Sequence, residues 1–307
     1  MWPPEPDTPI QVLPGRLAVL ACYFNPCGYE APKRNFLRFA AALRERRIPL
    51  HAIELAFGDE PFFLEPGDGI ARVRGADVLW QKERMLNRLL ESVPPEFDKV
   101  AWVDADLIFT NPHWADDASR LLERYPVVQL FEQAVPLTRE GHHGDVRNGV
   151  AFAVAHGLKD ARHLGISHPG FAWAARRELI ARHGLLDTNI VGGSDSMMVY
   201  AMFGWSYIDY LNRYGAGMRE SFLAWAGPFW EEVRGRVGYV PGQVLHMWHG
   251  SRADRKYDER VDWLGRHDFD PMTDIAPDGN GLWRWASEKP GMHDRIRRYF
   301  FERREDH

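Results

Sequence analysis

Short apolar runs alternate with amphipathic segments along much of the chain, and this alternation restricts the fold more than any other feature. The apolar runs have the length of strands, and the segments between them carry apolar side chains at helical spacing. Strands separated by helices form a mostly parallel sheet with helices packed on its faces. We therefore predict the α/β class, with strands at residues 17–23, 48–55, 100–103 and 127–131 and helices at residues 33–46, 82–91, 114–124, 176–183 and 194–203.

The composition fits one large domain, with or without appended segments. The chain has 307 residues, of which 45% are hydrophobic, and a formal net charge of -5. That length suffices for a full core. The mild acidity gives no overall reason to expect nucleic acid, although a local basic patch stays open. Residues 268–281, rich in Pro, Gly and Asp, predict irregular structure, and the basic-aromatic residues 296–304 predict a terminal helix with a solvated face.

The cysteine content and the apolar runs bear on the compartment. Cys22 and Cys27 are the two cysteines of the chain, which favours a reducing compartment and is a poor zinc signature. The N-terminus lacks a basic region followed by an apolar run, so no signal peptide is expected. No run reaches the length of a bilayer span. We expect a cytoplasmic protein.

Two aspartates, Asp104 and Asp106, follow the predicted buried strand at residues 100–103. If this segment is extended, both carboxylates point to the same side. Paired hard oxygen donors at the end of a strand suit a divalent cation that carries phosphates. The same pattern also occurs in solvated turns, but carboxylates that interrupt an apolar run need a partner. The pair therefore favours a metal-dependent enzyme acting on a nucleotide-activated substrate.

Two histidines near the other end of the chain are candidates for the same ion. His246 and His249 are three residues apart, a spacing that lets both imidazoles face one ligand, although ordinary hydrogen bonds are the alternative. A mixed set of carboxylates and imidazoles favours Mn²⁺ over Mg²⁺. Arg252 follows, and it is a candidate contact for phosphate oxygens or part of a solvated basic turn.

A glycine pair precedes a third candidate group. Gly192 and Gly193 let the backbone approach a ligand closely. Asp195 is then placed to act as a general base on an attacking hydroxyl. The alternative is a helix start, and both hold if Ser194 caps the helix while Asp195 faces the pocket.

These motifs, in this order, resemble the GT-A glycosyltransferases, and most closely the inverting β-1,4-galactosyltransferase-like group, over about residues 17–255. The resemblance implies that Asp106, His246 and His249 bind the metal, that Asp104 contacts the ribose or the metal through water, and that Asp195 is the catalytic base. Ser194 stands where the family has Glu, and His246 where it has Met. The matching segments are Trp80-Gln-Lys82-Glu-Arg-Met-Leu-Asn87, Asp104-Ala-Asp106, Gly170-Phe-Ala-Trp-Ala, Gly192-Gly-Ser-Asp195 and His246-Met-Trp-His249.

The resemblance also implies a domain plan and a reaction. Residues 1–265 would form the GT-A domain, with a nucleotide-binding half at about 14–132 and an acceptor and metal half at about 133–265, followed by an irregular extension at 266–307. Trp80 would lie by the uracil and Lys82 by the nucleotide. A UDP-sugar would donate its sugar, with inversion, to an unidentified acceptor: a glycan, a metabolite or a modified nucleic acid base.

Two other classes of protein remain as alternatives. Metal-dependent phosphatases and nucleotidyltransferases also carry paired aspartates at strand ends, but an aspartyl-nucleophile phosphatase would carry them after its first strand. The second alternative is a non-catalytic protein that binds nucleotide sugars on the scaffold of an enzyme that has lost its activity. The joint presence of Asp104, Asp106, Asp195, His246 and His249 argues against decay.

Overall fold

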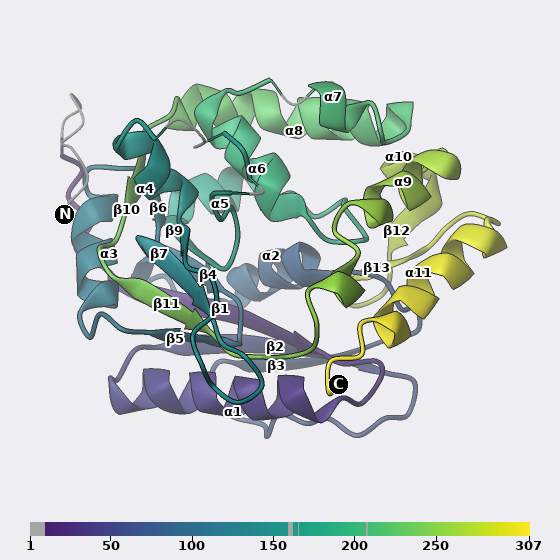
Figure 1. The fold of residues 1–307 in the computed structure, drawn as a ribbon, viewed down its shortest axis with the longest axis horizontal. Helices are drawn as coiled ribbons and strands as arrows, with labels where there is room; N and C mark the ends of the chain where they lie inside the picture. The colour runs from purple at the N-terminus through teal and green to yellow at the C-terminus, as the bar shows by residue number, and fades with distance from the viewer. Residues whose placement is uncertain (1–9, 159–161, 165, 207) are drawn as a thin grey trace.

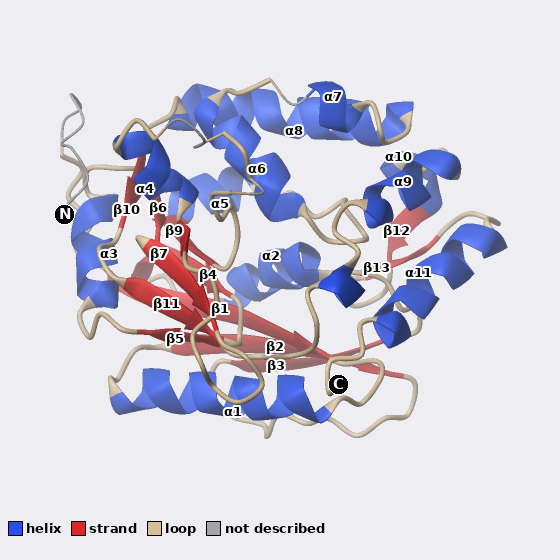
Figure 2. Cartoon of the chain, viewed as in Figure 1, coloured by secondary structure: helices blue, strands red, loops and turns tan. Residues whose placement is uncertain are grey.

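A seven-stranded, mostly parallel sheet forms the centre of the protein (Figures 1 and 2). The computed structural model describes residues 10–158, 162–164, 166–206 and 208–307. The strand order is β10-β6-β9-β4-β1-β2-β3. Strand β9 runs antiparallel to β4 and β6, whereas the other pairings in this sheet are parallel. The predicted α/β class is therefore confirmed. The strands are β1 Arg16–Phe24, β2 Leu50–Phe57, β3 Ile70–Gly75, β4 Phe97–Val103, β6 Val127–Gln129, β9 Ala172–Arg176 and β10 Val237–Tyr239.

Both faces of the central sheet are buried. Along β1, Ala18 and Leu20 belong to one hydrophobic cluster, and Val19 and Ala21 belong to another on the opposite face. This division follows from the alternation of side chains along a strand. A parallel sheet covered on both faces has apolar strands throughout, which is why β1 appears in the sequence as a continuous apolar run.

Helices supply the two covering layers (Figure 1). In α1, the buried Phe36, Phe39 and Leu43 recur at helical spacing and face the sheet. Helices α1 and α3 contribute to one cluster and α2, α5, α6 and α8 to the other. The helices are α1 Glu30–Glu45, α2 Lys82–Ser92, α3 Trp114–Leu122, α4 Val150–Ala155, α5 Arg177–His183, α6 Ser194–Phe203, α7 Ile208–Leu211, α8 Ala216–Val233, the 3-10 turn Ala253–Arg255, α9 Glu259–Arg266, α10 Pro271–Asp274 and α11 Pro290–Glu302.

A second sheet, in the order β5-β11-β7-β8, lies beyond the carboxyl end of β4. Its strands are β5 Leu107–Phe109, β7 Gln133–Pro136, β8 Arg147–Asn148 and β11 Gln243–His246. The antiparallel pairing of β5 and β11 sets His246 opposite Leu107. Residues more than a hundred positions apart are thereby brought to the end of β4.

The C-terminal segment is ordered into regular elements, so the predicted irregular extension at 266–307 is wrong. It contains α10, the strands β12 Ile275–Pro277 and β13 Trp283–Trp285, and α11. The apolar side chains of α11 belong to the same core cluster as those of α2, and they include Met292, Ile296 and Phe300. The helix expected near residue 296 exists. Tyr299 and Phe300 are core residues, whereas Arg297, Arg298 and Phe301 are exposed, so the helix has the predicted solvated face.

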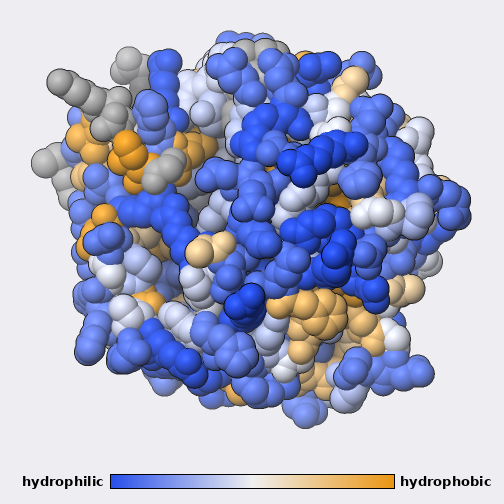
Figure 3. Space-filling view, turned by 45° about the vertical axis from the view of Figure 1, so that its right-hand side comes forward, coloured by the Kyte–Doolittle hydropathy of each residue, from blue (hydrophilic) through white to orange (hydrophobic). Residues whose placement is uncertain are grey.

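Hydrophilic side chains cover most of the face shown in Figure 3, with apolar groups gathered in smaller patches. Within the described part of the chain, none of the helices has the length and apolar character needed to cross a bilayer. The stretch at residues 141–149, expected to be a loop, is mostly irregular and contains the short strand β8.

Candidate functional site

Three predicted metal ligands meet at the end of the central sheet. Asp106 lies in the turn between β4 and β5, and its carbonyl accepts a hydrogen bond from the Met247 amide at 2.8 Å. Its Oδ2 lies 2.9 Å from Nε2 of His249 and 3.4 Å from Nε2 of His246. The two Nε2 atoms are 3.0 Å apart. One carboxylate and two imidazoles therefore converge on a single point.

The donor set of this cluster fits a divalent cation. The ligating atoms of Asp106, His246 and His249 all lie within 4.8 Å of one another. The second carboxylate oxygen of Asp106, Oδ1, is buried and has no hydrogen-bond partner among the described residues. A buried carboxylate oxygen without a donor is costly, and an ion would satisfy it. Mixed carboxylate and imidazole donors suit Mn²⁺-like metals.

The charges in the cluster are set by burial and by its own members. Burial opposes ionisation of Asp106, but His246 and His249 outweigh it and hold the pKa of this carboxyl well below its usual value. Burial lowers the pKa of His246. Burial and Arg255 oppose protonation of His249, but Asp106 and Glu305 outweigh them and raise its pKa. Asp106 is therefore ionised, and His249 holds a proton more tightly than His246.

Aromatic stacking orients the first histidine. The ring of Phe171 stacks on His246 with centroids 4.5 Å apart, and it stacks on His168 at 3.8 Å. Phe171 has a φ of 78°, unusual for a residue with a Cβ. This backbone conformation places the ring between the two imidazoles, so the segment before β9 helps to position a metal ligand.

A residue of the C-terminal segment contacts His249, the second histidine of the cluster. The sequence pattern did not predict this contact. Oε1 of Glu305 lies 3.5 Å from Nδ1 of His249, and Nη2 of Arg255 lies 2.5 Å from the same nitrogen. Metal binding through Nε2 requires Nδ1 to carry the proton. A guanidinium can only donate, so the Arg255 contact is incompatible with a proton on Nδ1. Once Nδ1 is protonated, Glu305 is the acceptor within reach, and carboxylate–histidine–metal arrangements of this kind orient the ligand.

Several contacts fasten this segment in place. The Asp306 carboxylate accepts hydrogen bonds from the amides of Glu30 at 2.9 Å and Ala31 at 2.7 Å, at the first turn of α1. A carboxylate there also interacts favourably with the helix dipole. Gly250 has a φ of 96°, and a Cβ on it would lie 3.0 Å from the carbonyl oxygen of Arg304. A glycine is therefore required at position 250, where the C-terminal residues Arg304 and Glu305 pack against the chain directly after His249.

Replacing Glu305 with Gln is expected to weaken Mn²⁺ binding by about 10–100-fold, the usual effect of losing an outer-shell carboxylate. The loss follows because the amide accepts the His249 proton less well than the carboxylate does. Calorimetric titration with Mn²⁺ measures the change. The matched control is Glu302→Gln, since Glu302 pairs with Lys256 and Arg295 at the end of α11. Equal affinities for the two variants would exclude this role.

A second cluster contains the other two predicted carboxylates. Nζ of Lys82 lies 3.0 Å from Oδ1 of Asp104 and 3.2 Å from Oδ2 of Asp195. Burial opposes the charge on Lys82, but Asp104, Asp195 and Glu83 outweigh it and raise its pKa well above the usual value. Burial raises the pKa of Asp104 to about 6 and that of Glu83 to about 7, although Lys82 opposes both shifts.

The expected geometry of the aspartate pair is therefore wrong. Residues after Val103 form a turn rather than an extended strand end, so the two carboxylates do not share one partner. Asp106 faces the histidines, whereas Asp104 pairs with Lys82 and lies outside the metal cluster found among the described residues. Asp104 shares Lys82 with Asp195 instead.

Asp195 occupies the first turn of α6 and is closely packed. A Cβ on Gly170 would lie 2.8 Å from its Oδ2, so the segment before β9 approaches this carboxylate through a glycine. Gly193, with a φ of 102°, is the N-cap residue of α6. The expected capping by Ser194 is wrong, because no side chain caps this helix and Oγ of Ser194 is buried without a described partner.

The predicted site residues gather around one large cleft of about 1470 Å³. Trp80 lies in its wall, stacked on Phe300 of α11 with centroids 6.4 Å apart. Gly192 packs against Trp80, and Arg252 is an exposed residue at the cleft. The predicted site residues that line the cleft are Trp80, Lys82, Asp104, Asp106, Gly193, Asp195, His246, His249 and Arg252.

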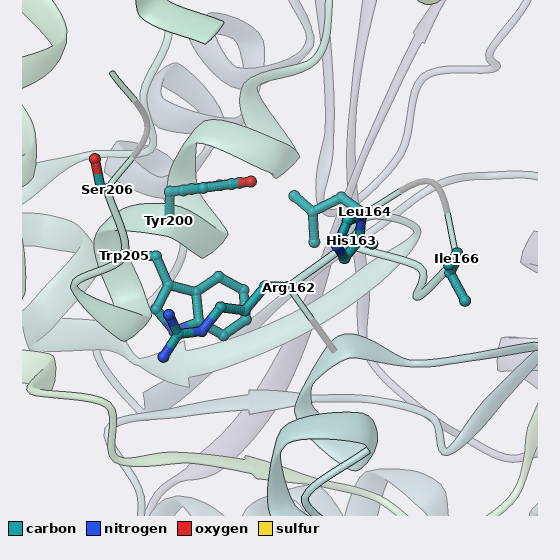
Figure 4. Close-up of a pocket in the computed structure, with 7 residues that line it drawn as sticks. All are labelled: Arg162, His163, Leu164, Ile166, Tyr200, Trp205 and Ser206. Atoms are coloured by element: carbon teal, nitrogen blue, oxygen red, sulfur yellow. The ribbon is translucent and has the colours of Figure 1, made fainter. Parts of the chain in front are cut away.

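A smaller hollow of about 470 Å³ adjoins the cleft (Figure 4). Leu164 and Tyr200 line both cavities. The guanidinium of Arg162 lies over the ring of Trp205, 5.6 Å from its centroid, and both residues line this hollow (Figure 4). None of the predicted site residues lines it.

No protein-family model matches the sequence, and no curated protein matches it significantly. Among solved structures, a mutant of Drosophila β1,4-galactosyltransferase 7 in complex with manganese, UDP-Gal and xylobiose matches 90% of this chain and 97% of that chain, with a TM-score of 0.42 and 11% identity. The catalytic domain of that enzyme with xylobiose matches 60% of this chain and 59% of that chain, less than two thirds of its length, with a TM-score of 0.33 and 14% identity.

Mannosyl-3-phosphoglycerate synthase from Rubrobacter xylanophilus matches 89% of this chain and 85% of that chain, with a TM-score of 0.41 and 12% identity. Glycosyltransferases are thus among the solved structures to which the chain is distantly similar, as the motifs predicted. At these scores the likeness assigns no activity, and the chemistry of the cleft is the basis for one.

Proposed function

We propose that the protein is a metal-dependent glycosyltransferase that moves a sugar from a nucleoside diphosphate donor, a UDP-sugar, to an acceptor hydroxyl with inversion. The observation that supports this most is the lining of the 1470 Å³ cleft. It combines a cluster of one carboxylate and two imidazoles with a separate, lysine-paired Asp195. The cluster suits the leaving diphosphate, and the separate carboxylate suits the attacking hydroxyl.

In this proposal Asp106, His246 and His249 hold the ion, which is Mn²⁺, with Mg²⁺ as the alternative. When bound, the cation supplies Lewis-acid stabilisation for the departing diphosphate. Phe171 and Glu305 keep the two imidazoles oriented. Trp80 lies by the base, and Lys82, Asp104, Gly192, Gly193 and Arg252 contact the rest of the donor.

Asp195 takes the proton from the acceptor hydroxyl, which attacks the anomeric carbon from the side opposite the diphosphate. Lys82 lies within 3.4 Å of both carboxylate oxygens of Asp195, so it orients this carboxylate. The acceptor is a glycan, a metabolite or a modified nucleic acid base. A single displacement of this kind inverts the anomeric configuration.

A thermal-shift panel of nucleotides and nucleotide sugars, with and without Mn²⁺, tests the proposal. A ligand at 100 times its dissociation constant adds about 2.7 kcal/mol to the unfolding free energy. UDP and UDP-sugars are expected to raise the melting temperature in the presence of Mn²⁺ only. Release of phosphate from a generic phosphomonoester would instead favour a phosphatase, and binding without any UDP-sugar hydrolysis or transfer would favour a non-catalytic binding protein.

The Mn²⁺ affinity is expected to fall as the pH is lowered from about 8 to about 5, through the range in which histidine titrates. The raised pKa of His249 means that this ligand retains its proton to higher pH. Metal binds the neutral imidazole and must displace that proton, so acid weakens binding, whereas Asp106 stays ionised throughout. Mn²⁺ titrations across this range measure the effect, and a constant affinity would contradict it.

A further inference from the structure

Three arginines on the wall of the cleft form a buried cationic cluster. Arg255, Arg260 and Arg303 are only 6%, 7% and 8% exposed, and all three line the cleft. Glu305 is the buried carboxylate among them, at 3.0 Å from Arg255 and 2.6 Å from Arg303. Positive charge therefore exceeds negative charge within this cluster.

Arg260 carries the uncompensated charge. Its Nη1 donates to the hydroxyl of Tyr299 at 3.1 Å, and its guanidinium lies 4.8 Å from the ring centroid of Tyr257. No carboxylate of the described residues lies within ion-pair distance of it, unlike Arg255 and Arg303. A buried charge without a counter-ion is strongly unfavourable, so this position is suited to an anion supplied by a ligand.

A second unpartnered donor lies beside this guanidinium. A Cβ on Gly192 would lie 3.2 Å from Nη1 of Arg260 and 3.2 Å from Cε2 of Trp80. The indole Nε1 of Trp80 is buried and has no hydrogen-bond partner among the described residues. A Cβ on Gly193 would lie 3.4 Å from Nη2 of Arg260. Arg260 and Trp80 thus pack directly on the glycine pair. Trp80 is assigned to the base of the donor, so Arg260 is the cation left at this point of the cleft.

Arg260 has different neighbours from Arg255, although the Tyr299 hydroxyl accepts from Arg260 and donates to the carbonyl of Arg255. Arg255 contacts His249, a proposed metal ligand. Arg260 instead adjoins the glycine pair that leads into Asp195. Because this glycine pair leads into Asp195, the base in the proposed function, an anion beside Arg260 is assigned to the transferred sugar or to the acceptor.

We propose that Arg260 anchors a negatively charged group, a carboxylate or a phosphate monoester, on the transferred sugar or on the acceptor. This inference rests on the proposed function, because that function places the diphosphate at the metal cluster. Bidentate hydrogen bonds from guanidinium to carboxylate or phosphate are strong and directional. The enzyme thereby selects an anionic sugar substrate over its neutral counterpart.

Paired probes distinguish the two sources of the anion. Calorimetric titration with Mn²⁺ present compares UDP-glucuronate with UDP-glucose for the donor. With UDP and Mn²⁺ bound, it compares glucose 6-phosphate with glucose for the acceptor. In one of the pairs the anionic member is expected to bind about 10–100-fold more tightly, the range for charge-assisted hydrogen bonds. Absence of this preference in both pairs would overturn the proposal.

Arg260→Gln is expected to abolish that preference while leaving the affinities for UDP and for the neutral probe unchanged. Arg260→Lys, which keeps the charge, should retain part of it. Arg266→Gln is the matched control, since Arg266 is an exposed arginine of the same helix α9. An equal loss of UDP affinity in Arg260→Gln would overturn the proposal, because it would place Arg260 at the diphosphate. Melting temperatures establish that each variant is folded.

Inorganic phosphate, titrated without nucleotide or metal, separates this inference from the proposed function. The wild type is expected to bind phosphate, and Arg260→Gln to bind it at least about 10-fold more weakly. If UDP fails to bind with Mn²⁺ while this difference holds, the proposed function is wrong and the anion site stands. If UDP binds but Arg260→Gln binds phosphate as the wild type does, the anion site is wrong and the proposed function stands.

Discussion

Replacing Asp195 with Asn is expected to reduce the turnover rate by about 10²–10⁴-fold, the usual contribution of a general base. The amide cannot accept the proton of the acceptor hydroxyl, although it preserves the size of the side chain. The affinities for UDP and Mn²⁺ should stay near those of the wild type, because Asp195 lies outside the metal cluster among the described residues. Initial-rate kinetics together with calorimetric titrations of UDP and Mn²⁺ measure both effects.

The control for this experiment is Asp116→Asn, an exposed aspartate in the first turn of α3, which should retain normal kinetics. A parallel loss of binding and turnover in Asp195→Asn would contradict the assignment, since it would show that this carboxylate organises the cleft instead of accepting a proton. Such a structural role is possible because Asp195 forms an ion pair with Lys82. A lowered melting temperature of the variant would indicate the structural role, and an unchanged one would indicate loss of the proton acceptor.

Replacing Asp106 with Ala is expected to weaken Mn²⁺ binding by more than about 100-fold. Loss of a residue that only supports a ligand already lowers metal affinity by about 10–100-fold, and Asp106 is itself a proposed ligand. Asp106 is the carboxylate of the cluster and lies within 3.4 Å of both imidazoles. Transfer activity should fall to background, because the leaving diphosphate loses its Lewis acid. Electron paramagnetic resonance of free Mn²⁺ reports the affinity, and transfer assays report the rate.

His113→Ala is a suitable control, since His113 is exposed at the start of α3. Asp104→Ala provides a second comparison, because the structure pairs this carboxylate with Lys82. Its effect on Mn²⁺ affinity should be much smaller than that of Asp106→Ala. If the two variants lose metal equally, then both carboxylates ligate the ion and the separation of their roles is wrong.

Local pattern was enough to predict the two helices that carry Lys82 and Asp195. The apolar periodicity of residues 82–91 predicted α2 to within a residue, because an amphipathic helix records its buried face at every turn. The glycine pair followed by Ser194 and Asp195 and an apolar run predicted α6, which is buried on most sides. Strand β9 was not predicted. Its sequence, Ala-Trp-Ala-Ala-Arg, has little β-branched character, and its place between β4 and β6 arises from pairing with distant partners.

Residue type and spacing were sufficient to identify the side chains suited to a metal and a base, since carboxylates and imidazoles are recognised in this way. The division of these side chains between the two clusters depends on the folded arrangement. The turn after Val103 directs Asp106 to the histidines and Asp104 to Lys82. The fold also brings Arg260 and Glu305 to the cleft, where burial and the surrounding charges give each residue its role. Such contacts join residues far apart in the chain, and no local spacing encodes them.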